Sequence, residues 1–179
     1  MAKRIDKLAS EAVVAAFNEQ VGNELGASNQ YVAIAAYFAQ QSLPELAKFF
    51  YLQANEEREH AMKFVRFLVD VDGKIEIPEI AKPLSGFTSA RAAVEASLEW
   101  EKTVTQQIYG LVEIVRAEAN YIALRFLDWF VNEQLEEVTT MQTLLDLVTR
   151  AGDNGLLYVE DYLARRGGVA AANPIGGAD

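Results

Sequence analysis

Apolar residues recur every three to four positions along four long stretches of the chain, which is the spacing of one face of an α-helix. Ser10 is a candidate N-cap, Pro44 suits a first helical turn, and Gly73 and Gly152 suit the position just past a helix end. The pattern therefore predicts four long helices and a shorter amphipathic one. Their ranges are about 10–39, 44–73, 89–117, 121–151 and, for the short helix, 156–165.

The connections between these helices predict how they are arranged. Those after the first and third helices are only a few residues long, so each joins antiparallel neighbours. The connection over 73–88 contains Pro78, Pro83 and Gly86 and is long enough to cross a bundle, so the second and third helices can run parallel. We expect an all-α fold in one domain over 1–166, followed by a flexible Gly- and Ala-rich tail over 167–179.

A glutamate interrupts the inward apolar stripe of each long helix near its midpoint. These residues are Glu24, Glu57, Glu101 and Glu137, and no Lys or Arg lies on the four stripes. In a bundle the four carboxylates would meet at one level, where each unpaired charge costs several kcal/mol or is neutralised by a pKa shift. A multivalent cation removes both the desolvation penalty and the mutual repulsion. The sequence therefore predicts a buried metal site.

The donor types narrow the choice of metal. Glu57 and His60 lie one turn apart on the same face, and carboxylates with one imidazole suit Fe, Mn or Zn better than Cu(I). Four carboxylates and one histidine are enough donors for two ions, with Glu57 as the natural bridge. Two such ions could share a two-electron reduction of oxygen or peroxide.

Other residues near these stripes have two open interpretations. Glu56, Glu133 and Glu136 stand one position beside the stripe, where they form either a solvated face or a place for a third ion on its way through. Tyr31, taken alone, fits a core position better than a redox role. We assign the remaining acids, Glu160 among them, to the surface.

Composition removes several classes of protein. The 179 residues include no cysteine, which excludes disulfides, iron–sulfur clusters, thiolate zinc sites and cysteine nucleophiles. Sixteen basic against 26 acidic residues give a net charge of −10, which disfavours nucleic acid and attracts cations. The longest apolar stretch, 31–39, is far shorter than the ~20 residues that span a bilayer, and the first apolar run is too short for a signal peptide. We expect a soluble, cytoplasmic protein.

With these segments in place, the sequence resembles the non-haem ferritins of bacteria and archaea over roughly residues 10–165. The matching segments are 23–33, 56–61, 100–102 and 129–137. The resemblance implies a ferritin-like four-helix bundle with a long crossover between the second and third helices and a short fifth helix. It also implies a 24-subunit cage that oxidises Fe(II) with O₂ or peroxide and stores a ferric oxyhydroxide mineral.

The resemblance also assigns roles to individual residues. Glu24, Glu57 and His60, with Gln134 as a candidate fourth ligand, would form one iron site of a ferroxidase centre. Glu57, Glu101 and Glu137 would form the second. A third iron would be held by Glu56, Glu133 and Glu136, and Tyr31 would be the tyrosine beside the centre.

Differences from the bacterioferritin sequence pattern argue against a haem cofactor. Bacterioferritins carry a second E-x-x-H on the fourth helix, where this chain has Gln134-x-x-Glu137. They bind haem through a methionine directly after the bridging glutamate, where this chain has Arg58. We therefore expect no haem.

Two other functions remain open at this point. One is a carboxylate-bridged di-iron or manganese–iron oxidase acting on an organic substrate, although such enzymes usually have more than one histidine. The other is a non-catalytic helical bundle in which the buried acids only specify how the helices pair.

Overall fold

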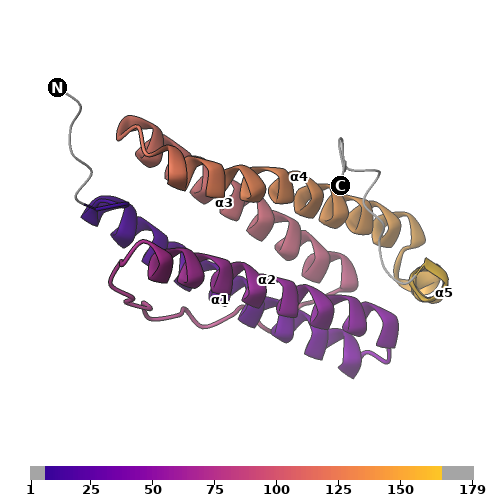
Figure 1. The fold of residues 1–179 in the computed structure, drawn as a ribbon. Helices are drawn as coiled ribbons and strands as arrows, with labels where there is room; N and C mark the ends of the chain where they lie inside the picture. The colour runs from indigo at the N-terminus through magenta and orange to yellow at the C-terminus, as the bar shows by residue number, and fades with distance from the viewer. Residues whose placement is uncertain (1–6, 167–179) are drawn as a thin grey trace.

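The computed structural model describes residues 7–166. All regular secondary structure in this part of the chain is helical. Two antiparallel hairpins, α1–α2 and α3–α4, pack side by side, and α5 lies at one end of the bundle (Figure 1). The predicted tail over 167–179 lies outside the described residues. The elements are α1 (Glu11–Gln40), α2 (Pro44–Asp70), α3 (Ala90–Ala117), α4 (Tyr121–Ala151), the 3₁₀ turn η1 (Asp153–Gly155) and α5 (Leu156–Arg166).

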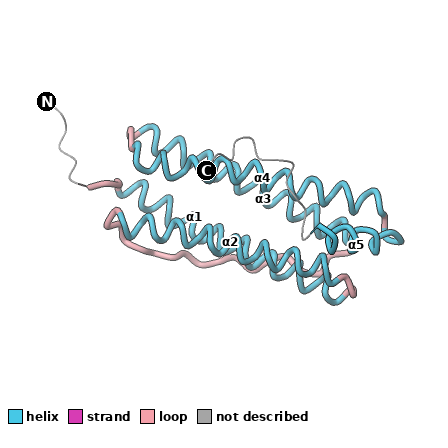
Figure 2. The backbone as a smooth tube through the Cα atoms, turned by 45° about the vertical axis from the view of Figure 1, so that its right-hand side comes forward, coloured by secondary structure: helices cyan, strands magenta, loops and turns pink. Residues whose placement is uncertain are grey.

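The order and direction of the helices confirm the predicted topology. Ser10, the N-cap of α1, donates a hydrogen bond from its Oγ to Glu118 Oε1 at 2.8 Å, which places the start of α1 beside the end of α3. Since α1 is antiparallel to both α2 and α3, α2 and α3 run parallel. The fold is thus the all-α ferritin-like bundle, with the crossover running along its length (Figure 2).

The end of α2 differs from the prediction, which placed it at Gly73. Asp72 adopts a left-handed conformation (φ 55°), so that its N–H bonds Val69 O and the next N–H, of Gly73, bonds Leu68 O. This is the hydrogen-bond pattern with which many helices end. Gly73 meets a different need: a Cβ there would lie 3.0 Å from Val14 Cγ2.

Two apolar clusters fill the bundle and leave a polar layer between them. One surrounds Phe17 and Phe64 and joins the start of α1 to the ends of α2 and α3. The other surrounds Phe38 and Phe50 and extends to α5. The layer between them contains all four mid-stripe glutamates, and its position at half-height follows from the polar breaks in the stripes.

The crossover is fixed to α1 by side-chain amides. Gln30 is 1% exposed and bonds Leu84 twice, accepting from its N–H at 2.7 Å and donating to its carbonyl at 3.1 Å. Asn18 makes an equivalent pair with Lys74 O and Glu76 N, both at 2.8 Å. These bonds satisfy backbone groups that an irregular segment would otherwise leave unpaired.

Glu160 of α5 corrects its assignment to the surface. It is only 9% exposed, and its two oxygens accept hydrogen bonds of 2.8 Å from the backbone N–H groups of Glu45 and Leu46. These groups belong to the first turn of α2, whose N-cap residue Leu43 makes no side-chain cap. Glu160 therefore caps α2 from another helix, where the helix dipole favours a negative charge.

Over residues 7–166, no helix combines the length and the apolar character that crossing a membrane requires.

Candidate metal centre

The four long helices bring the predicted metal ligands into two overlapping groups. Glu24, Glu57 and His60 form one group, and Glu57, Glu101 and Glu137 form the other. In each group one ligand atom per residue lies within 4.8 Å of the others. Every member is at least 96% buried, and Glu57 belongs to both groups.

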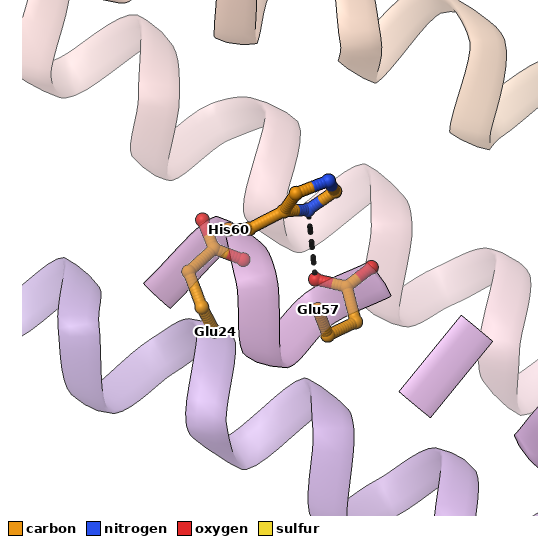
Figure 3. A group of neighbouring side chains, drawn as sticks. All are labelled: Glu24, Glu57 and His60. Atoms are coloured by element: carbon orange, nitrogen blue, oxygen red, sulfur yellow. Dashed lines mark ion pairs between the residues drawn. The ribbon is translucent and has the colours of Figure 1, made fainter. Parts of the chain in front are cut away.

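The first group joins α1 to α2. Glu24 of α1 faces Glu57 and His60, which stand one turn apart on α2 (Figure 3). His60 Nδ1 lies 3.4 Å from Glu57 Oε2. The imidazole is flanked by aromatic rings, with Trp129 in edge contact at 5.3 Å between centroids and Phe130 at 6.0 Å. These rings restrict the orientation of the imidazole.

Several buried side-chain atoms that could bind a metal in these groups have no hydrogen-bond partner. They are Glu24 Oε2, both carboxylate oxygens of Glu57, Glu101 Oε2 and His60 Nδ1. Unpartnered buried polar atoms are rare in folded proteins because each costs free energy. In a site with this much negative charge, bound cations would compensate that cost.

The protein does hold one oxygen of Glu24 and one of Glu101. Gln20 Nε2 donates to Glu24 Oε1 at 2.9 Å, and the Tyr31 hydroxyl donates to Glu101 Oε1 in a short hydrogen bond. Each carboxylate thus keeps a single free oxygen, whereas Glu57 has two. This division fits Glu24 and Glu101 as ligands of one ion each and Glu57 as a bridge between two.

Gln134 is buried beside the second group. Its Oε1 accepts a 2.8 Å hydrogen bond from Thr105 Oγ1. An amide oxygen has two lone pairs, so Oε1 can accept this bond and still offer a lone pair to a metal ion.

Burial sets the protonation of the cluster. Loss of hydration, followed by repulsion from neighbouring carboxylates, raises the pKa of Glu57 and Glu137 well above the usual value. Burial also raises the pKa of Glu24, and it raises that of Glu101 to about 7. Without metal, the cluster therefore retains protons near neutral pH, and incoming cations must displace them.

His60 and Tyr31 respond to the same negative surroundings. Burial alone would lower the pKa of His60, but the neighbouring carboxylate of Glu133 and the charges of Glu24 and Glu137 raise it. Burial and the charge of Glu101 raise the pKa of Tyr31 well above 10, so its hydroxyl remains a hydrogen-bond donor.

The residues predicted for a third ion are arranged differently from the first two groups. Glu56 and Glu136 are exposed and Glu133 is half-buried. Within the described residues, Glu133 forms a possible ligand group with His60 and Glu137 instead, with Glu133 Oε1 lying 3.7 Å from His60 Nε2. Glu56 accepts a hydrogen bond from Gln53. The third site stays a prediction.

Sequence reasoning missed two supporting residues, Gln20 and Thr105. Gln20 lies outside the inward stripe of its helix, so the apolar pattern gave no sign that it is buried. Thr105 lies on its stripe, but a threonine at such a position is common in cores. The one available signal for Gln20 was its place one turn before Glu24.

The chain is similar in sequence to known proteins over most of its length. The Ferritin-like domain family matches residues 14–151. The chain is 44% identical over 160 residues to ferritin BfrB of Mycolicibacterium smegmatis, covering 89% of this chain and 88% of that protein. It is 38% identical over 159 residues to a bacterial non-heme ferritin of Staphylococcus epidermidis, covering 88% and 96%.

Among solved structures, an open-pore ferritin from the archaeon Archaeoglobus fulgidus superposes with a TM-score of 0.85 at 30% identity. The superposition covers 88% of this chain and 97% of that one.

Proposed function

The chain belongs to the ferritin family, and we propose that it is an iron-storage ferroxidase. It oxidises Fe(II) with O₂ or peroxide at a di-iron centre within each subunit, in the cytoplasm. The ferric product is stored as an oxyhydroxide mineral inside a 24-subunit cage. Iron is thus the substrate and the cargo of this protein.

One observation carries this proposal: buried carboxylates and His60 form two groups that share Glu57, and five of their side-chain atoms are buried without a hydrogen-bond partner. Carboxylate and imidazole donors suit Fe(II), and the shared carboxylate would keep two ions close enough to react with one oxidant molecule. Each ion gives one electron, so the pair supplies the two electrons that reduce O₂ to peroxide or peroxide to water.

The overall reaction balances without another reductant. Four Fe(II), one O₂ and four H⁺ give four Fe(III) and two H₂O, over two cycles of the centre. Hydrolysis of each Fe(III) to FeO(OH) then releases three protons. The chain's own acids serve these steps: the net charge of −10 attracts Fe(II), and the buried carboxylates lose their protons as it binds.

Three further acids lie between the di-iron centre and solvent: Glu56, Glu133 and Glu136. Glu133 lies beside His60, and the charges of Glu133 and Glu136 act on Glu56, so the three acids lie near one another at the outer side of the centre. We propose that they hold an ion briefly as it enters or leaves.

An organic substrate would need a pocket that reaches the centre. A cavity of about 370 Å³ opens nearby, beside Trp129 and Phe130. Its described lining contains aromatic and basic side chains but none of the candidate ligands. This geometry favours small oxidants over an organic substrate.

Iron oxidation by the apoprotein tests the proposal. We expect ferric absorbance to appear much faster than in buffer when Fe(II) is added in air. Glu57→Gln, which keeps the side-chain volume but removes the shared charge, should abolish the fast phase. Glu113→Gln, at a position whose side chain is 78% exposed, should leave it unchanged. Wild-type rates in Glu57→Gln would refute the assignment.

A further inference from the structure

We propose that Gln20 is a positioning residue of this centre, which holds Glu24 so that Oε2 is the oxygen that this carboxylate presents to a metal ion. The inference rests on the proposed function, because it concerns how one ligand of the di-iron centre is prepared. Gln20 itself does not touch the metal.

Gln20 is placed and oriented for this role. It is 2% exposed and lies one turn before Glu24 on the same face of α1. Its Nε2 donates to Glu24 Oε1 at 2.9 Å, and its Oε1 accepts from Asn23 Nδ2 at 3.1 Å. Because Asn23 engages the oxygen of the amide, the nitrogen is directed at Glu24.

This hydrogen bond restricts how Glu24 can bind. A carboxylate with two free oxygens can chelate one ion through both and so occupy two coordination positions. The hydrogen bond from Gln20 makes Oε1 the weaker ligand, so Oε2, which is buried and unpartnered, is the oxygen that Glu24 presents to an ion. The ion beside Glu24 would then keep a coordination position for water or an oxidant.

Hydrogen bonding differs in the same way between the other carboxylates, according to the number of ions that each would bind. Glu101 also has one oxygen held, by Tyr31 from a neighbouring helix, and its other oxygen is unpartnered. Glu57, which would bridge the two ions, accepts no hydrogen bond at either oxygen, and its Oε2 lies 3.4 Å from His60 Nδ1. Hydrogen-bond donors thus restrain two ligands that would serve one ion each and leave the bridging ligand free.

The same helix provides a matched control. Gln30 is another buried glutamine of α1, 1% exposed, but its amide bonds the backbone of Leu84 in the crossover. Replacing either glutamine by methionine removes the amide and keeps the length of the side chain. Gln20→Met and Gln30→Met therefore make the same chemical change in two surroundings.

The experiment is a titration of the apoproteins with Co(II), an air-stable substitute for Fe(II). Calorimetry measures the affinities, and visible absorption reports the coordination of the bound Co(II). We expect Gln20→Met to lose about tenfold in affinity for one of the two Co(II) ions, a usual cost of removing a supporting hydrogen bond. Its absorption bands should weaken as the Co(II) coordination number rises. Gln30→Met should lower thermal stability but keep wild-type affinities and bands.

Equal Co(II) binding by Gln20→Met and the wild type would overturn the inference, as would equal losses in Gln20→Met and Gln30→Met. If Gln20→Met does not fold, Asn23→Ala decides the question. It frees the amide of Gln20 at a half-buried position, and a smaller loss confined to the same ion supports the inference, whereas unchanged binding refutes it. A wild-type protein that binds no Co(II) would instead refute the proposed function.

Discussion

Glu101 makes the folding stability of the metal-free protein depend on pH. Burial raises its pKa from 4.5 to about 7, so between these values the folded protein binds a proton that the unfolded chain has lost. The stabilising effect of this proton is present at acidic pH and disappears as the pH rises through about 7. For one group, such a shift amounts to something on the order of 3 kcal/mol.

We therefore expect the apoprotein to lose thermal stability as the pH rises from 4.5 to 7. Glu101→Gln replaces the carboxyl by a neutral group of the same shape, so its melting temperature should fall less over this range. Scanning calorimetry of both proteins without metal measures the difference. Parallel pH profiles for the variant and the wild type would show that Glu101 does not retain its proton.

The sequence indicated which acids are buried together in the candidate site more completely than it indicated the residues that hydrogen-bond them. Glu24, Glu57, Glu101 and Glu137 interrupt apolar stripes, and such a break is visible in one dimension. Gln20 could not be recognised in this way, because its role depends on which way its amide points. That orientation is set by the hydrogen bond that Asn23 donates to the amide oxygen.

At the scale of the helices, the prediction was accurate wherever local sequence sets the outcome. The bounds of α1, α3 and α4 agree within about one residue with those expected from the apolar period and the caps. The predicted end of α2 was wrong because Asp72, and not Gly73, adopts the left-handed conformation that glycine usually adopts after a helix. Gly73 instead packs closely against Val14, whose Cγ2 would lie 3.0 Å from a Cβ at this position.

The cap that α5 gives to α2 was missed for another reason. Glu160 is 115 positions from the first N–H group that it caps, so no local pattern relates the two. In sequence it resembles the exposed Asp161 beside it, which pairs with Arg165 at the surface.

Replacing Glu160 by Gln should destabilise the protein, since the helix N-terminus would lose a charged acceptor. We expect a loss of about 1–2 kcal/mol in the free energy of unfolding, measured by urea titration. Asp161→Asn is the control, and as an exposed ion pair it should change stability by less than about 1 kcal/mol. Equal effects of the two changes would contradict the capping role.

At the scale of the whole molecule, one chain leaves large apolar side chains in solvent. Tyr121, Leu157 and Tyr158 are each more than 70% exposed, and the last two lie on α5 at the end of the bundle. Isolated exposures of this kind are common, but several together often mark contacts with partners. They are consistent with a subunit that assembles.

Assembly into the proposed cage predicts a particle mass of about 475 kDa, which is 24 copies of the 19.8 kDa chain. Sedimentation velocity before and after iron loading measures it, and the loaded particle should sediment faster because mineral adds mass inside a constant volume. A monomer or dimer would contradict the cage and favour an oxidase that acts on an organic substrate.

The most direct test of the account is anomalous diffraction at the iron absorption edge, from crystals exposed to Fe(II) without oxygen. The account predicts two iron peaks in each subunit. One should lie among Glu24, Glu57 and His60, and the other among Glu57, Glu101 and Glu137. Iron found only at surface acids, or no iron within the bundle, would contradict it.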